Sequence, residues 1–344
     1  MQPASLLKAA LLTALLVAAF VAGWEWHWRS QGFAISYNDD ESLWASKRKL
    51  IYQTTPARPV VIGSSRIKFD LDQDTWAGLT GERPVMLALV GTSPRPVLTD
   101  LGKDVNFKGT VIVDVVEGIF FAPSGSRQEK RALERLKAYP KWSLAQQLSF
   151  HLNRRLESAL VFLDEERLTL DVFLTRLAVP NRPGVFTPPL FPQKFAYNNF
   201  DRQTRMTDKF VADTALQAQM RRVWMAPGGM SGRRGNGGDT LTALLASVKR
   251  SVDQIRARGG RVVFVRCPSD GPLRAAENKG YPRAQYWDRL LADTRTPGVH
   301  FADYPALARY RCPEWSHLTP RDAATFTRDL IPIMQQQTGW RIRL

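Results

Sequence analysis

The chain contains, at residues 59–66, the stretch Pro59-Val60-Val61-Ile62-Gly63-Ser64-Ser65-Arg66. Its first part is short, apolar and β-branched, which is typical of a strand buried on both faces of a parallel sheet. Its second part is a polar turn at the end of that strand. Reactive groups in open α/β sheets collect beyond the carboxyl ends of the strands, so this turn is a candidate site.

Four further apolar runs predict the rest of the sheet. They are Val85–Gly91, Thr110–Val116, Arg261–Arg266 and Val299–Ala302. Helical patterns lie between some of the runs, and the clearest covers Thr240–Arg258 before it stops at two glycines. The sequence therefore predicts a three-layer α/β/α fold with a parallel sheet of about five strands.

The spacing of the runs predicts how the chain is divided. The third and fourth runs are about 145 residues apart, far more than a crossover connection needs. We therefore expect a large, mostly helical insertion at 122–238, within an α/β domain formed by 59–121 and 239–344. Residues 30–58 are polar and mixed, and we expect them to be a membrane-proximal linker.

Residues 1–29 predict a transmembrane helix. The run from Leu6 to Gly23 is apolar except for Lys8, and a rise of about 1.5 Å per residue makes it nearly long enough to cross a bilayer core. Three indoles follow within Trp24–Trp28, as is typical of the headgroup level. We expect an uncleaved, single-pass signal anchor in the inner membrane with the main domain in the periplasm. A signal peptide cleaved after Val21-Ala22-Gly23 is the alternative, and it also implies export.

The charge balance suggests an anionic partner. The 344 residues include 48 Lys and Arg against 32 Asp and Glu, a net charge of +16. Export argues against nucleic acid and leaves anionic lipid headgroups or an anionic glycan, with an ordinary solvated surface as the alternative. With two cysteines and four histidines, the composition leaves little room for a metal centre, and we expect no metal and no cofactor.

The two cysteines are a candidate disulfide. Cys267 and Cys312 belong to the exported part of the chain, where disulfides persist. A bridge that closes the loop between them would stabilise the fold by about 4 kcal/mol on the chain-entropy model.

Three polar clusters could supply acyl-transfer chemistry. Gly63–Arg66 follows the first strand, Gly91-Thr92-Ser93 follows the second, and Glu314-Trp315-Ser316-His317 precedes the last helix. A nucleophilic serine needs a base, the base needs an orienting carboxylate, and the oxyanion needs backbone donors. The three clusters contain all of these groups.

This arrangement resembles the SGNH hydrolases, the superfamily of GDSL-type esterases and acyltransferases, over roughly 58–120 and 240–338. The resemblance implies that the α/β/α domain is flavodoxin-like. The resemblance implies that Ser65, rather than Ser64, is the nucleophile, and that the amides of Ser65 and Gly91 form the oxyanion hole. It also implies that His317 is the base and Glu314 its orienting carboxylate. Ser64 and Arg66 are possible auxiliary residues.

The chain departs from the family pattern at two places. Glu314 stands where the family has aspartate, and no asparagine follows the third strand, where the family has an oxyanion donor. Asn198 or Asn199 of the insertion is a candidate substitute. The Gly-Ser-Ser-Arg form looks most like membrane-anchored SGNH proteins that accompany membrane-bound O-acyltransferases, including the D-alanyl transfer protein of teichoic acid and exopolysaccharide acetylation proteins.

The resemblance implies an exported, membrane-anchored esterase or O-acyltransferase that acts on ester groups, acetyl above all, of a cell-envelope glycan or exopolysaccharide. Its implied partners are that glycan, the membrane and a membrane-bound O-acyltransferase. Two alternatives stay open. One is a catalytically silent SGNH-like subunit that binds a glycan or the acyltransferase. The other is an unrelated α/β envelope protein in which Ser65 and His317 are structural.

Overall fold

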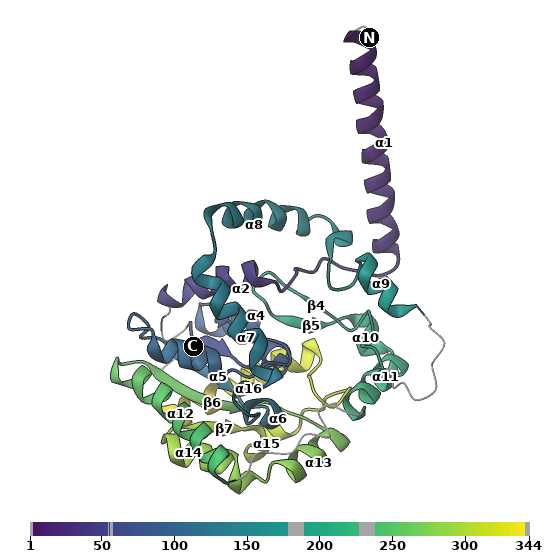
Figure 1. Ribbon diagram of the computed structural model, residues 1–344. Coiled ribbons are helices and arrows are strands. Elements are labelled where there is room, and N and C mark those ends of the chain that lie inside the picture. Colours follow the sequence, from purple (N-terminus) through teal and green to yellow (C-terminus); the bar gives the residue numbers. More distant parts are fainter. Residues whose placement is uncertain (1–2, 54, 56–57, 178–188, 227–237, 341–344) are drawn as a thin grey trace.

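The computed structural model describes residues 3–53, 55, 58–177, 189–226 and 238–340. It has an α/β fold built on a five-stranded parallel sheet with the strand order β2-β1-β3-β6-β7 (Figure 1). The strands are β1 (Val60–Ile62), β2 (Val85–Met86), β3 (Thr110–Asp114), β6 (Arg261–Arg266) and β7 (Gly298–His300). Each predicted apolar run overlaps one of these strands, so the α/β class and the mostly parallel sheet are confirmed.

Helices connect the strands and cover both faces of the sheet. In the first half of the chain they are α1 (Pro3–Ser30), α2 (Glu41–Arg48), α3 (Ser65–Asp70), α4 (Gln73–Thr80), α5 (Arg95–Lys103), α6 (Glu117–Phe120), α7 (Arg127–Ala138), α8 (Leu144–Glu157) and α9 (Leu170–Arg176). In the second half they are α10 (Asp208–Ala212), α11 (Thr214–Met225), α12 (Gly238–Ala257), α13 (Gly271–Gly280), α14 (Trp287–Thr294), α15 (Pro305–Ala308) and α16 (Pro320–Thr338).

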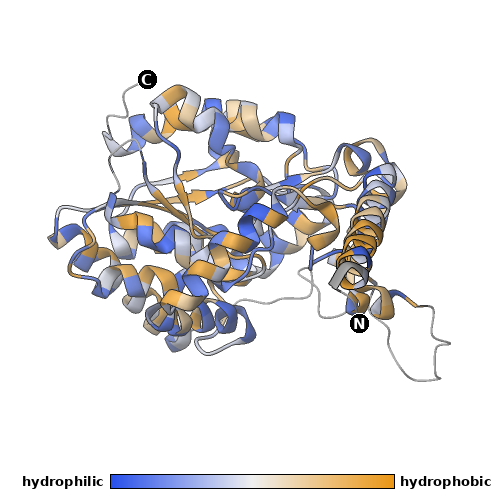
Figure 2. Ribbon diagram, turned by 90° about the horizontal axis from the view of Figure 1, so that it is seen from above, coloured by the Kyte–Doolittle hydropathy of each residue, from blue (hydrophilic) through white to orange (hydrophobic). Residues whose placement is uncertain are grey.

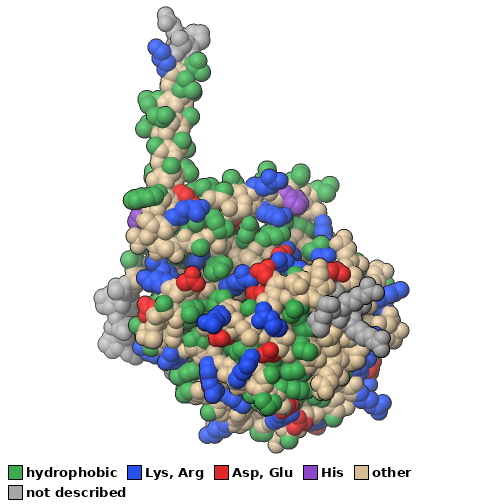
Figure 3. Space-filling view, turned by 180° about the vertical axis from the view of Figure 1, so that it is seen from behind, with side chains coloured by type: hydrophobic (Ala, Val, Ile, Leu, Met, Phe, Trp, Pro, Cys, Tyr) green, Lys and Arg blue, Asp and Glu red, His purple; other side chains and the backbone are tan. Residues whose placement is uncertain are grey.

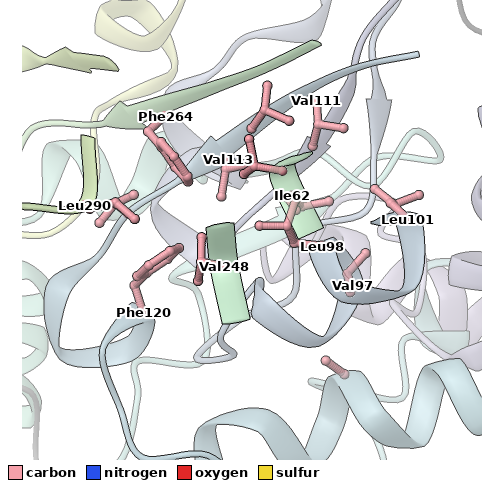
Figure 4. Close-up of a cluster of buried hydrophobic side chains, with 14 of the residues drawn as sticks. Ile62, Val97, Leu98, Leu101, Val111, Val113, Phe120, Val248, Phe264 and Leu290 are labelled. Carbon is pink, nitrogen blue, oxygen red and sulfur yellow. The ribbon is translucent and has the colours of Figure 1, made fainter. Parts of the chain in front are cut away.

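Alternate residues of the strands supply two separate cores, because successive side chains of a strand point to opposite faces. Ile62, Val113 and Phe264 lie in the core between the sheet and α5, α12 and α14 (Figure 4). Val61 and Ile112 lie in the core on the other face, which α3, α4 and α16 cover. Both faces are therefore buried, which explains why the strands are continuously apolar.

The helix α1 extends away from the body of the molecule (Figure 1). Its side chains are mostly hydrophobic, as Figures 2 and 3 show by colour. The segment Ser5–Ser30 is long and apolar enough to cross a membrane, by length and composition. The chain thus has one N-terminal apolar helix that fits either a membrane anchor or a signal sequence.

The segment 30–58, expected to be a linker, is instead partly built into the domain. It contains α2, and Trp44 of that helix is fully buried in the first core, where its indole N–H donates to the carbonyl oxygen of Leu87 at 3.2 Å. Asp39 is also buried and forms ion pairs with Lys68 at 2.7 Å and Arg202 at 2.6 Å. Apolar and paired side chains within a polar segment therefore dock it onto the body.

The insertion between β3 and β6 is largely helical, as expected, but it also contains a small antiparallel hairpin. The hairpin is formed by β4 (Ala196–Asn198) and β5 (Thr204–Met206). Arg202, in the turn of the hairpin, donates to the carbonyl oxygens of Met86, the last residue of β2, and of Ala88, two residues further along the chain. The hairpin is therefore fixed to the sheet beside the carboxyl ends of the strands.

Candidate active site

The predicted nucleophile lies in the turn between β1 and α3. Ser64 is the N-cap of α3, and its side-chain oxygen accepts a hydrogen bond from the N–H of Arg66. Gly63 is required before this turn because a Cβ atom there would meet the Cβ of Asp114 at 2.4 Å and Ile67 Cγ2 at 2.7 Å. The close approach of β3 to this turn fixes the direction in which Ser65 leaves the sheet.

Ser65, His317 and Glu314 form one chain of hydrogen bonds. Ser65 Oγ is 2.9 Å from His317 Nε2, and His317 Nδ1 is 2.9 Å from Glu314 Oε1. With the ring proton on Nδ1, toward the carboxylate, Nε2 is free to accept the serine proton. His317 and Glu314 are buried, whereas Ser65 is partly exposed, so a substrate can approach only from the side of the serine.

A tight turn positions Glu314 and His317 relative to each other. Glu314 Oε1 accepts hydrogen bonds from the N–H of His317 at 2.6 Å and from the N–H of Ser316 at 3.3 Å. Trp315 between them has a φ of 77°, in the left-handed region that side chains rarely adopt. Such a conformation costs of order 1–3 kcal/mol and persists only where the surroundings impose it.

The insertion contributes a residue to the site that the sequence did not reveal. Trp224 of α11 donates its indole N–H to Glu314 Oε2, the carboxylate oxygen that does not face His317. It lies 90 residues before Glu314, and nothing in the local pattern connects the two. Because both carboxylate oxygens are hydrogen-bonded, Glu314 is held in a fixed orientation behind the histidine.

Aromatic rings surround the imidazole of His317. The ring centroid of Phe69 in α3 lies 4.3 Å away, that of Trp224 5.9 Å and that of Phe195, just before β4, 6.0 Å. Two of these three rings come from the insertion. The insertion therefore forms one wall of the candidate site, although the sequence placed it outside the α/β domain.

Arg66 connects the turn that contains Ser65 to the loop that contains His317. Its Nε donates to the carbonyl oxygen of Ser316 at 3.2 Å, and its Nη2 pairs with Glu277 of α13 at 2.7 Å. The side chain is buried, so Arg66 acts as a positioning residue rather than as a group exposed to substrate.

Glu277 is shared between two guanidinium groups, because Arg266 at the end of β6 also pairs with it at 2.5 Å. Burial opposes ionisation of Glu277, but the charges of Arg66 and Arg266 outweigh this effect and lower its pKa to about 2. Glu277 therefore carries its charge in the folded protein over the whole ordinary pH range.

Ser64 faces inward, away from the histidine. Its Oγ donates to Asp114 Oδ2 at 3.0 Å, and its backbone N–H donates to the same oxygen at 3.2 Å. Burial raises the pKa of Asp114, which lies at the end of β3. Of the two adjacent serines, only Ser65 is within hydrogen-bond distance of His317 in this structure.

The two predicted oxyanion amides, those of Ser65 and Gly91, lie in the segments that follow the neighbouring strands β1 and β2. The N–H of Leu89 donates to the carbonyl oxygen of Gly63 at 3.0 Å, so the segment after β2 runs beside the serine turn. Gly91, two residues further on, is exposed and has a φ of 65°, which favours glycine. The N–H of Ser65 is in the first turn of α3, where amides have no intrahelical acceptor.

No asparagine follows β3 at the place where the resemblance implies an oxyanion donor. Glu117 follows β3 and forms a buried ion pair with Arg266 at 2.9 Å. The side chain of Asn198 accepts from Thr204, and that of Asn199 accepts from the N–H of Gln203. Both candidate asparagines are thus engaged within the hairpin, and in the part of the chain that the structure describes no hydrogen bond joins either of them to Ser65.

The expected disulfide is not formed. Cys267 and Cys312 are free thiols, both buried in the core on the α16 side of the sheet. Burial raises the pKa of each thiol well above its ordinary value, so both sulfurs are held protonated and pack as small apolar groups. The packing of this core, rather than a covalent bridge, connects the end of β6 to the Glu314–His317 turn.

Groups of three or more His, Cys, Asp or Glu side chains suited to a metal ion are not found among the residues that the structure describes. No family model matches the chain, and no curated protein is significantly similar to it.

Proposed function

We propose that the protein is an exported, membrane-anchored serine esterase or O-acyltransferase of the SGNH type, which acts on ester groups of a cell-envelope glycan. The hydrogen-bonded chain from Ser65 through His317 to Glu314 is the observation that carries this proposal. It joins Ser65 to a histidine 252 residues away and to that histidine's neighbouring carboxylate, in the order that acyl transfer needs.

The order of the elements supports the SGNH comparison. The strand order β2-β1-β3-β6-β7 is that of a doubly wound sheet of flavodoxin type. Ser65 follows β1, Gly91 follows the second strand along the chain, and Glu314 and His317 lie just before the final helix α16. These are the positions at which the family carries its nucleophile, an oxyanion glycine and its acid–histidine pair.

The reaction would proceed by double displacement. His317 Nε2 removes the proton of Ser65 Oγ as that oxygen attacks the ester carbonyl carbon, while the N–H groups of Ser65 and Gly91 stabilise the oxyanion. The tetrahedral intermediate collapses, the alcohol leaves with the proton from His317, and an acyl-serine remains. Water or a sugar hydroxyl, deprotonated by His317, then attacks the acyl-serine and releases Ser65.

The proposal that the protein is exported and anchored is based on α1, and the proposal of a glycan substrate is based on the family resemblance. In a single-pass topology with the body in the periplasm, the active-site serine would meet envelope polymers rather than cytoplasmic metabolites. A membrane-bound O-acyltransferase is the matching source of acyl groups, since such an enzyme can deliver an acyl group to the periplasmic face of the same membrane.

A fluorophosphonate probe tests the proposal directly, because it labels only an activated serine. We expect labelling of the full-length protein that disappears in Ser65→Ala and persists in Ser64→Ala. The second variant is the matched control, since it removes the same atom from the neighbouring residue. Labelling that persists in Ser65→Ala would contradict the assignment.

A catalytically silent SGNH-like subunit is the second candidate, and one observation favours it. Glu117 stands where the family has an oxyanion asparagine, and one such donor is worth about 10²–10³ in rate. Complete absence of labelling in a protein that is folded and binds an acetylated glycan would favour this reading over the enzyme.

A further inference from the structure

The helix α8 carries an apolar stripe on the side that faces away from the body. Leu144, Leu148, Leu152 and Leu156 recur every four residues and are between 51% and 78% exposed. A helix that only covers a soluble core exposes its polar side, so a leucine stripe on the outer side indicates a contact with something else.

The opposite side of α8 is packed against the body. The ring of Phe150 stacks on that of Phe200, with 6.4 Å between centroids, and the Arg154 guanidinium lies 3.5 Å from the centroid of the same Phe200 ring. Gln147 accepts a hydrogen bond from Lys49 Nζ at 2.7 Å. The orientation of α8 is therefore fixed, and its leucines point outward.

A second helix extends this surface. Leu170 and Leu174 of α9, and Leu177 just beyond it, are each more than half exposed. Together with the four leucines of α8 they form what we name the leucine face. It is defined by Leu144, Leu148, Leu152, Leu156, Leu170, Leu174 and Leu177.

The leucine face is joined directly to the base of α1. The Glu25 carboxylate accepts hydrogen bonds from the N–H groups of Val161 and Phe162, in the short connection between α8 and α9. Arg29 donates to the carbonyl oxygen of Ala159 at 3.1 Å, just after α8. The end of α1 is thus hydrogen-bonded to the connection that joins the two helices that carry the leucines.

The position of the leucine face relative to the bilayer can be inferred from its contacts with α1. If Ser5–Ser30 crosses a bilayer, the indoles at 24–28 lie at the headgroup level. Trp28 stacks on Phe173 of α9, with 5.6 Å between ring centroids, which puts α9 at the same level. Figure 1 shows α8 running across the direction of α1, on the side of the body from which α1 extends.

We propose that the leucine face lies in the interface of the bilayer that α1 crosses, with α8 parallel to the membrane plane. The apolar side chains enter the boundary between headgroups and acyl chains, as in interfacial amphipathic helices. Arg155 on the flank of α8 and Lys141 just before it are exposed and can reach anionic headgroups. Figure 3 shows hydrophobic and basic side chains together along this edge of the body.

This docking rests on the membrane anchoring through α1 in the proposed function, but it does not depend on the catalytic part of that function. A single anchoring helix leaves the body free to tilt, whereas the leucine face gives it a second attachment. The body would then keep one orientation, and Ser65 would stay at a constant height above the membrane.

Site-directed fluorescence tests the proposal with the full-length chain in nanodiscs of phosphatidylcholine and phosphatidylglycerol. A bimane label is placed at Leu148→Cys or Leu170→Cys, and at Val105→Cys as the matched control, since Val105 is 71% exposed on the loop between α5 and β3. The native thiols are buried and do not compete for the label. Intact mass shows that each sample retains α1.

We expect nitroxide groups on the lipid acyl chains to quench the labels at 148 and 170 several-fold more than the label at 105, and aqueous iodide to show the reverse order. Labels at 148 and 170 that iodide reaches as readily as the label at 105 would overturn the proposal. Labels shielded from iodide but not quenched by the lipid nitroxide would overturn it too, because a second copy or a partner protein would then cover the leucine face. Neither readout depends on catalysis, so failure of the serine assignment is distinguishable.

Discussion

The carboxylate of Glu314 takes part in more contacts than the sequence could predict. One oxygen accepts from the ring of His317 and from two backbone N–H groups, and the other accepts from Trp224. The turn that allows this contains Trp315 in a left-handed conformation. At this position the extra methylene of glutamate, relative to the aspartate of the family pattern, does not prevent contact with the histidine.

Replacing Glu314 with glutamine tests this role. An amide can hold the imidazole in the wrong tautomer and cannot stabilise the imidazolium, so kcat for an activated ester should fall by about 10⁴. The rate of p-nitrophenyl acetate hydrolysis measures it. Glu134→Gln, an exposed change of the same kind on α7, is the control and should leave the rate unaltered. Equal rates for Glu314→Gln and the unmodified protein would remove Glu314 from the mechanism.

At the scale of elements, the insertion is part of the site rather than an appendage. The side chains of Phe195 and Trp224, from the segment before β4 and from α11, lie against the ring of His317. The hairpin turn is fixed to the sheet through Arg202 and Asp39. The insertion therefore depends on the sheet for its position, and the catalytic histidine proposed above depends on the insertion for its surroundings.

Trp224→Phe separates the hydrogen bond of the indole from its packing. The variant keeps an aromatic ring beside His317 but removes the donor to Glu314. Leaving that acceptor unpaired costs about 1–3 kcal/mol, so we expect kcat/KM to fall by about tenfold or more. The steady-state rate of p-nitrophenyl acetate hydrolysis by the two proteins measures this loss.

The matched control is Trp142→Phe, which makes the same chemical change before α8, where the indole nitrogen has no hydrogen-bond partner among the residues that the structure describes. We expect Trp142→Phe to keep the rate of the unmodified protein, and an equal loss of kcat/KM in both variants would contradict the prediction.

At the scale of the whole molecule, part of the positive charge is internal. Arg66, Arg202, Arg266 and Lys68 are all buried and paired with carboxylates. The net charge of +16 therefore does not translate directly into a basic surface. These buried pairs join α3, the hairpin turn, β6 and α13 close to the candidate site, and breaking one would leave an uncompensated charge inside the molecule.

Glu277→Gln tests how much one of these pairs contributes. At pH 7 the variant should lose about 3–5 kcal/mol of unfolding free energy, since two buried guanidinium groups lose their shared partner. The pKa of Glu277 is lowered from 4.5 to about 2 on folding, so its contribution is fully present above pH 4.5 and is lost as the pH falls toward 2. Urea unfolding at pH 7 and pH 3 should show a difference between the two proteins that shrinks on acidification.

The control for this prediction is Asp253→Asn, which breaks an exposed pair with Lys249 and should change stability by less than about 1 kcal/mol at either pH. If the difference between Glu277→Gln and the unmodified protein were constant from pH 7 to pH 3, the ionised state of Glu277 would not be its source.

The sequence alone determined the α/β class, the five strands, the apolar N-terminal helix and the positions of Ser65, Gly91, Glu314 and His317. These follow from local patterns, because apolar runs record burial and polar turns record the ends of strands. No such pattern within 30–58 predicted that this segment docks onto the body. Its buried indole, Trp44, and its buried carboxylate, Asp39, are single residues in a polar segment and form no periodic pattern.

Only the tertiary structure decided what surrounds the site. Trp224 contacts Glu314 across 90 residues, and Arg66 reaches Ser316 across 250. The tertiary structure also shows that Cys267 and Cys312 are buried free thiols, and that the leucine face lies beside the base of α1. Contacts of this kind depend on how distant elements pack together, and no local periodicity in the chain specifies which distant side chain a buried polar group will meet.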